Sequence, residues 1–141
     1  MIWKQAFNVE TLNQTGRQTM VEHLGIEFTG FGDDFLEARM PVGQRTMQPM
    51  GLLHGGASCV LAETMGSVAS FLCIEDASQF APVGVEINAN HLRPATRGYV
   101  SGKVSPLRIG RKLHVWNIEI KDEEERLICV SRITIAVVSR R

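Results

Sequence analysis

Residues 56–74 read GASCVLAETMGSVASFLCI, and Glu63 is the one charged side chain in this stretch. No other charge lies three or four residues from Glu63, where a solvent-facing stripe of a helix would carry it. An unpaired carboxylate in an apolar helix is costly to bury, so it either lowers the stability of the protein or serves chemistry. We therefore expect Glu63 to be functional. The alternative is a solvent-facing position on an ordinary amphipathic helix.

The segments around this stretch predict one long helix and several strands. Residues 41–51 hold two prolines and two glycines and predict a long loop, which leads into a helix over residues 53–73, about 30 Å long. Residues 26–31 and 35–40 alternate around a Gly-Asp-Asp turn and predict a β-hairpin, and residues 9–12 and 19–24 predict short helical turns. Four further runs have the strand period: residues 82–92, 99–107, 112–121 and 127–138.

These elements fit one architecture. A helix that is apolar almost all round must be covered nearly all round, and strands of about nine residues match it in length at about 30 Å. Short connections between the last four strands favour an antiparallel meander. The sequence predicts an α+β protein with an antiparallel sheet wrapped around one long central helix, which is the hotdog fold, in a single domain over residues 1–141.

Composition narrows the class of protein. The 141 residues are 44% hydrophobic and 21% charged, and the formal net charge is zero, so the bulk charge does not indicate nucleic acid or an anionic membrane as a partner. Cys59, Cys73 and Cys129 form no CxxC pair and have no histidine at ligand spacing, which disfavours a metal site and fits a reducing compartment. The N-terminus lacks the features of a signal peptide. The one candidate for a membrane span, residues 51–74, carries a histidine and a glutamate. We expect a cytoplasmic protein that neither spans a membrane nor holds a metal.

The start of the predicted helix is a second candidate site. First-turn amides have no acceptor within the helix and lie at the positive end of its dipole, and Gly55 and Gly56 allow a ligand to approach that backbone closely. Such amides suit a carbonyl oxygen that becomes an oxyanion during acyl transfer. Gln48 and His54 flank the glycines and are candidates to donate to the carbonyl or to line its pocket. The alternative is that the glycines merely allow tight helix–sheet packing.

The spacing of these two candidates predicts an oligomer. Gly55 and Glu63 lie eight residues apart, about 12 Å along one helix. A base or nucleophile must lie within about 3–3.5 Å of the atom that it attacks. If both residues serve one carbonyl, they must therefore come from two antiparallel copies of the helix in a two-fold dimer.

Two further sets of polar residues are weaker candidates. Thr64 and Ser67 could orient the carboxylate or a water, although hydroxyls in helices more often bond to the preceding turn. A basic group lies near two strand ends and could bind phosphates; otherwise it is a solvated surface. Its members are Arg93, Arg97, Arg108, Arg111 and Lys112.

Residues 46–58, TMQPMGLLHGGAS, with Ala62-Glu63-Thr64 after them, resemble the hotdog-fold acyl-CoA thioesterases. The similarity is greatest to bacterial aromatic acyl-CoA thioesterases of the 1,4-dihydroxy-2-naphthoyl-CoA hydrolase and enterobactin-proofreading types. It extends over the whole chain, with matching segments at residues 1–4, 32–34, 86–91 and 106–116. Met50 stands where these relatives usually carry phenylalanine, so the wall of the acyl pocket is expected to differ.

The resemblance implies a role for each candidate. Glu63 would be the nucleophile or general base, and the Gly55 amide, helped by Gln48, would polarise the thioester carbonyl. His54 would line the acyl site, with Thr64 and Ser67 near the carboxylate or the leaving group. The CoA part of the substrate would run over Gly84, His91, Leu92, Arg93, Pro94, Arg108, Ile109, Gly110, Arg111, Lys112 and Leu113. The family pattern also implies no metal or organic cofactor, and a homodimer that assembles into a homotetramer.

Other functions stay open at this stage. The acyl group could be carried by an acyl or aryl carrier protein instead of CoA, and a hotdog dehydratase acting on acyl carriers is a second enzyme class. A non-catalytic acyl-CoA binding module is a third reading, but a pure binder has no need of a costly carboxylate at its pocket.

Overall fold

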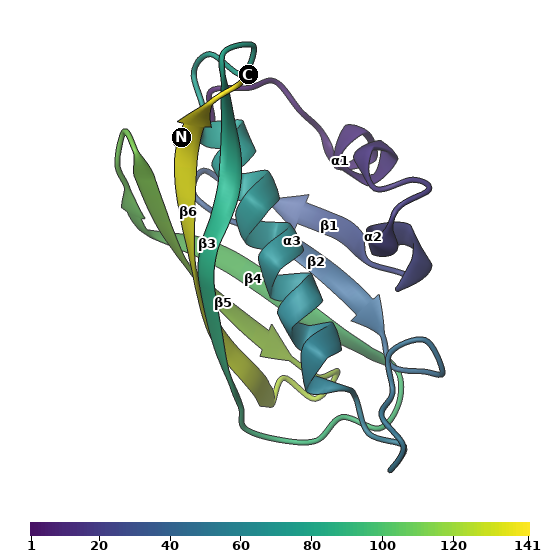
Figure 1. The fold of residues 1–141 in the computed structure, drawn as a ribbon. Coiled ribbons are helices and arrows are strands. Elements are labelled where there is room, and N and C mark those ends of the chain that lie inside the picture. The colour runs from purple at the N-terminus through teal and green to yellow at the C-terminus, as the bar shows by residue number, and fades with distance from the viewer.

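The computed structural model describes all 141 residues, which form three helices and six strands (Figure 1). The helices are α1 (Val9–Thr15), α2 (Met20–His23) and α3 (Gly55–Cys73). The strands are β1 (Glu27–Phe31), β2 (Leu36–Pro41), β3 (Phe80–His91), β4 (Tyr99–Ile109), β5 (Leu113–Lys121) and β6 (Leu127–Ser139). Every predicted element is present, and the α+β architecture with one long helix against an antiparallel sheet is confirmed.

The order of the strands differs in one respect from the predicted meander. The sheet runs β1-β2-β4-β5-β6-β3, with all neighbours antiparallel, so β3 pairs with β6 at an edge and does not touch β4. Residues 92–98 connect β3 to β4, and seven extended residues reach about 23 Å. That exceeds the three strand spacings, about 14 Å, that separate β3 from β4. A short connection therefore did not require the two strands to be neighbours.

Helix α3 lies along one face of the curved sheet (Figure 1). Its sheet-facing side is buried and includes Leu61, Met65, Ala69 and Leu72. Gly66 allows this close packing, since a Cβ there would lie 2.5 Å from Cγ2 of Ile133 on β6.

The opposite side of α3 is not fully covered. Val60, Thr64 and Ser67 are half-buried, and Glu63 and Phe71 are exposed. The expectation that the helix is covered on nearly all sides is therefore wrong for the single chain. The sequence shows that this side lacks a charged stripe, but it does not show which part of the molecule, or which other molecule, would cover it.

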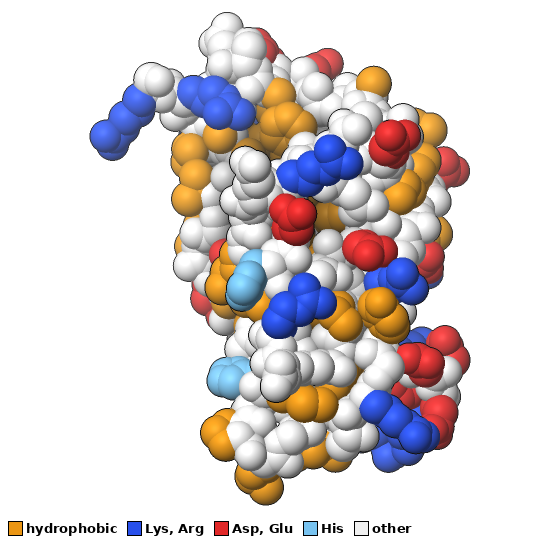
Figure 2. Space-filling model, turned by 90° about the vertical axis from the view of Figure 1, so that its right-hand side faces the viewer, with side chains coloured by type: hydrophobic (Ala, Val, Ile, Leu, Met, Phe, Trp, Pro, Cys, Tyr) orange, Lys and Arg blue, Asp and Glu red, His pale blue; other side chains and the backbone are white.

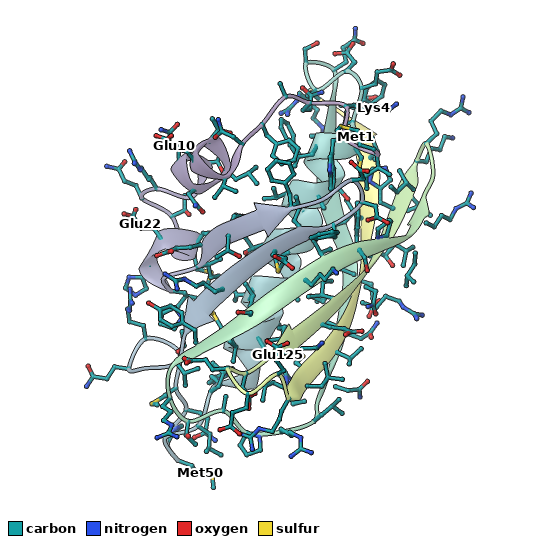
Figure 3. All side chains as sticks on the ribbon, turned by 180° about the vertical axis from the view of Figure 1, so that it is seen from behind. Met1, Lys4, Glu10, Glu22, Met50 and Glu125 are labelled. Carbon is teal, nitrogen blue, oxygen red and sulfur yellow. The ribbon has the colours of Figure 1, made fainter.

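The N-terminal segment binds to the far end of α3. The Lys4 N–H donates to the Leu72 carbonyl over 2.7 Å, and the Ile2 N–H donates to the Asp33 carbonyl over 2.9 Å. The buried Trp3 indole stacks on Trp116 of β5 with ring centroids 6.5 Å apart. These contacts hold the first residues near the C-terminal end of α3, while the loop with Met50 lies at the other end of the molecule (Figure 3).

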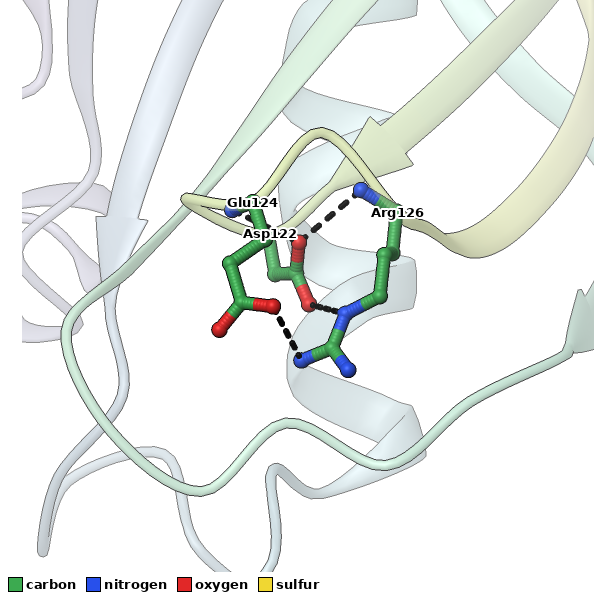
Figure 4. Close-up of polar contacts among 3 residues, drawn as sticks. All are labelled: Asp122, Glu124 and Arg126. Atoms are coloured by element: carbon green, nitrogen blue, oxygen red, sulfur yellow. Dashed lines mark hydrogen bonds and ion pairs between the residues drawn. The ribbon is translucent and has the colours of Figure 1, made fainter.

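The acidic turn between β5 and β6 lies at the surface of the protein. Arg126 donates from Nε to Asp122 over 2.8 Å and lies 3.6 Å from a carboxylate oxygen of Glu124 (Figure 4). The Arg126 and Glu124 side chains are 50% and 67% exposed, so the ion pair between these two contributes little to stability.

Candidate active site

The loop before α3 presents an amide without a protein acceptor. Residues 48–51 form a turn in which the Gly51 N–H donates to the Gln48 carbonyl over 2.9 Å, and Gly51 adopts φ +78°, which favours glycine. His54 is the N-cap of α3, and its Nδ1 accepts the Gly56 N–H over 2.8 Å. The Gly55 N–H precedes the first possible helical bond and meets no acceptor in the loop. It is therefore free to donate to a ligand.

A pocket of about 290 Å³ opens beside this amide. Gln48 and Gly55 line it together with the end of β3 and the residues that follow, namely His91, Leu92, Arg93 and Pro94. The His91 imidazole packs on Gly55, since a Cβ on that glycine would lie 2.7 Å from Nε2. The structure thus brings together the predicted carbonyl-binding group and one of the two predicted CoA-binding segments.

Glu63 lines a different pocket, of about 570 Å³, between α3 and the N-terminal helices. Thr64, Ser67 and Val68 share this pocket, with residues of α1 and α2 on its other side. The carboxylate lies against β3, where a Cβ on Gly84 would be 3.1 Å from Oε2. Charged side chains of both signs surround hydrophobic recesses on the face that carries the N-terminal helices (Figure 2).

The Glu63 side chain is exposed in the single chain, so the expectation of a buried carboxylate is wrong at this level. The absence of charged neighbours suggested that Glu63 is buried, but Glu63 lies on the side of α3 that the chain does not cover. Burial first, and the Glu63 carboxylate second, raise the pKa of the Cys59 thiol one helical turn earlier. That thiol stays protonated and is a poor competing nucleophile.

Gly55 and Glu63 therefore belong to separate pockets of one chain. The geometry matches the 12 Å separation expected from eight helical residues. Within one chain, the free amide and the carboxylate do not face a common site.

The basic residues do not form one patch. Arg93 and Arg97 follow β3, at the end of the molecule where α3 begins, whereas Arg111 and Lys112 line a pocket of about 770 Å³ with Lys4 and Cys73, where α3 ends. The prediction of five neighbouring cations is thus wrong, because the 11 residues of β4 separate the two groups by about 36 Å.

Several predicted residues stand free at the surface. Met50 is 80% exposed at the tip of its loop and lines neither pocket (Figure 3). Leu92, Ile109 and Leu113 are also exposed hydrophobic residues. Arg108 is exposed near the end of β4, and Gly110 begins the turn to β5.

Two groups of residues near the site were missed by the sequence reasoning. The pocket wall opposite Glu63 comes from α1 and α2, including Leu12 and Val21, and no pattern in those short helices indicates what they face. Ser70, His114 and Trp116 form a buried polar cluster. The alternation of β5 places His114 and Trp116 on one face, which is a usable signal, but it does not indicate contact with α3.

The structure contains no group of three or more His, Cys, Asp and Glu side chains arranged to hold a metal ion. Helix α3 is long and apolar enough to cross a membrane by composition, but half of that window is buried inside the protein, as in the core helix of a globular domain.

The chain belongs to the thioesterase superfamily, whose family model matches residues 50–129. It is 54% identical over 138 residues to the 1,4-dihydroxy-2-naphthoyl-CoA hydrolase of Escherichia coli K12, covering 98% of this chain and 100% of that protein. It is 52% identical over 138 residues to the proofreading thioesterase EntH of Cronobacter turicensis, covering 98% and 99%.

Solved structures agree with this assignment. The crystal structure of a Haemophilus influenzae thioesterase superposes with a TM-score of 0.95 at 51% identity, covering 99% of this chain and 96% of that one. The hotdog fold is therefore confirmed, and the protein is an enzyme of the thioester hydrolase class. Two structures of one Staphylococcus aureus protein, 38% identical, carry alanine in place of a glutamine or of a glutamate fifteen residues further on; they cover 84% and 86% of this chain with TM-scores of 0.80 and 0.83.

Proposed function

We propose that the protein hydrolyses acyl-CoA thioesters, with an aromatic acyl group, to the free acid and CoA. The free Gly55 amide, which lines one pocket with Gln48 and Arg93, is the observation that carries this proposal. It offers a donor where a thioester carbonyl develops negative charge, and one such donor raises kcat by a factor of about 10²–10³. The name of the E. coli relative supports an aromatic acyl-CoA as substrate, and the name of the C. turicensis relative supports a thioester.

The chemistry needs only groups that the chain supplies. The carbonyl oxygen accepts from the Gly55 N–H and from the Gln48 side chain, while His54 borders the acyl group. Glu63 then either removes a proton from an attacking water or attacks the carbonyl itself, forming an anhydride that water hydrolyses. In both routes the C–S bond breaks, the thiolate of CoA leaves and takes up a proton, and no metal or organic cofactor takes part.

Glu63 must meet the Gly55 of another chain. The uncovered side of α3 and the free edge of β3 lie next to each other, and both expose apolar side chains, including Phe71, Val83 and Val85. An exposed edge strand is a template for pairing with another chain. We propose that two copies pair there, with their α3 helices antiparallel, and that two such dimers form a tetramer.

The two S. aureus structures support a joint role for Gln48 and Glu63. The replaced glutamine and glutamate have the same separation as Gln48 and Glu63, fifteen residues. The two residue types that we propose for polarising the carbonyl and for the attack are thus the two that were altered in that relative.

The CoA moiety is proposed to contact two separate surfaces. His91, Leu92, Arg93 and Pro94 lie beside the Gly55 amide, whereas the turn from Arg108 to Leu113 is at the far end of the same chain. In a tetramer, one CoA would therefore touch the first surface on one protomer and the turn on another. Gly84 and Met50 would then border the substrate at the dimer contact.

A second candidate substrate is an acyl group on a carrier protein. The relative named as a proofreading thioesterase favours this candidate, since a carrier presents the same phosphopantetheine thioester. In either case we propose a cytoplasmic enzyme. If the protein binds acyl-CoA but hydrolyses neither substrate, a non-catalytic binding module replaces both proposals.

The test is thiol release from a panel of aromatic and aliphatic acyl-CoAs and from an aryl carrier protein. We expect Glu63→Gln to lower turnover by about 10²–10⁴-fold, the range for loss of a general base, with binding of the substrate retained. Glu22→Gln is the matched control, because Glu22 lines the same pocket and is expected to be dispensable. Equal turnover in the wild type and in Glu63→Gln, or equal loss of turnover and binding, would contradict the assignment.

A further inference from the structure

Three polar side chains meet in the apolar core between α3 and the sheet. Trp116 Nε1 lies 2.7 Å from Ser70 Oγ, and His114 Nδ1 lies 3.0 Å from the same oxygen. Ser70 and Trp116 have no exposed surface, and His114 retains 3%. Because each buried polar group costs free energy unless it has a partner, the pattern of protons in this cluster is strongly constrained.

One arrangement of protons satisfies all three side chains. The Trp116 indole can only donate, so Ser70 Oγ accepts from it. Burial lowers the pKa of His114, which favours the neutral imidazole. Neutral His114 can then accept the Ser70 hydroxyl proton at Nδ1, 3.0 Å away.

His114 is the second residue of β5 and pairs with Ile109 of β4, so the cluster lies beside the turn between β4 and β5. The Gly110 N–H donates to the Leu113 carbonyl over 2.8 Å, which closes the turn. Arg108, Arg111 and Lys112 surround this glycine, are exposed and form no ion pair. Their cationic groups are thus available to a ligand, and the position of their backbone depends on the turn.

Packing alone does not account for the cluster. Apolar side chains of similar shape can replace a buried hydrogen-bonded pair with little loss of stability. Three polar groups in directed contact instead fix one arrangement of α3, β5 and the turn, because any displacement leaves a buried donor without an acceptor.

We propose that His114 is a positioning residue for the substrate. Through Ser70 and Trp116 it ties the turn at Gly110 to α3, and so fixes where Arg108, Arg111 and Lys112 meet the phosphates of CoA. This inference rests on the proposed function, since it takes an acyl-CoA as the substrate.

The test compares one acyl group on two thiols, CoA and N-acetylcysteamine, which lacks the phosphates. We expect His114→Leu to raise KM for the CoA ester about 10-fold, equivalent to one lost hydrogen bond to a charged group, with kcat unchanged. KM for the N-acetylcysteamine ester should not change. His114→Gln should restore part of the affinity, and Ser70→Ala should reproduce the effect if His114→Leu fails to fold. Ile118→Ala is the control, because Ile118 is equally buried on the same face of β5 and should leave both KM values unchanged.

Calorimetric binding of CoA alone separates this inference from the proposed function. If the wild type hydrolyses neither ester but His114→Leu binds CoA about 10-fold more weakly, the positioning role stands and the proposed function falls. Equal losses on both esters, unchanged CoA affinity in the His114 and Ser70 variants, or no binding of CoA by the wild type would each overturn the inference.

Discussion

At the scale of single residues, the space beside Glu63 decides how its carboxylate is held. A Cβ on Gly84 would lie 3.1 Å from Oε2, so Gly84→Ala must displace the carboxylate by a few tenths of an ångström. We expect kcat to fall about 10-fold, because small displacements of a reacting group are costly. Gly43→Ala is the control, since nothing lies within 4 Å of the added carbon. Equal kcat values in the two variants, measured by thiol release, would contradict the placement of Glu63.

The burial of His114 leads to a separate prediction about the pH dependence of stability. Burial lowers its pKa in the folded protein, so between that value and the ordinary value of 6.5 the unfolded chain binds a proton that the native chain does not. The free energy of unfolding therefore falls as the pH falls below about 6.5, and His114 contributes no pH dependence above it. In urea unfolding between pH 5 and 8, the free energy of unfolding should fall less toward acid pH for His114→Gln than for the wild type. Parallel curves would show that His114 is not buried in its neutral form.

At the scale of the element, the start of α3 depends on His54. Its Nδ1 accepts the Gly56 N–H over 2.8 Å, which satisfies one of the free first-turn amides. We expect His54→Ala to lower the free energy of unfolding by about 1 kcal/mol, and His54→Asn, a strong N-cap, to retain most of it. Denaturant unfolding at one fixed protein concentration measures both. If His54→Ala lowers kcat while His54→Asn restores stability but not kcat, the imidazole also has a role beside the substrate.

The helices and strands themselves could be predicted from local patterns in the sequence. The switch from an apolar helix to strands of period two located α3 and the four later strands to within two residues, because periodicity reports which side of an element is buried. Strand order was not readable in the same way. The connection of residues 92–98 is long enough for several arrangements, and β3 pairs with β6, a strand that lies far from it in the sequence.

At the scale of the whole molecule, the predicted shared site can be tested by complementation. Glu63→Gln and Gln48→Ala each remove one half of the site. If each site takes Glu63 from one chain and Gln48 from its partner, a mixed dimer of the two variants contains one intact site and one doubly altered site. Refolding the variants together at equal amounts should restore about a quarter of the wild-type activity.

The same experiment also identifies sites that are formed within one chain. If each chain formed its own site, every site in the mixture would carry one substitution, and activity would stay at the level of the single variants. A mixture of Glu63→Gln with itself, refolded in the same way, controls for recovery during refolding.

The sequence by itself determined the fold class, the long central helix and the two candidate groups at Gly55 and Glu63, because each depends on local pattern or on spacing along one helix. It also indicated that these groups cannot meet within one chain, since the rise of a helix is fixed. Tertiary structure decided the rest. It placed Glu63 on an uncovered side of α3, set the two basic segments at opposite ends of the sheet, and brought Ser70 to His114 across 44 residues. These are contacts between distant segments, which depend on how elements pack and not on the pattern within any one of them.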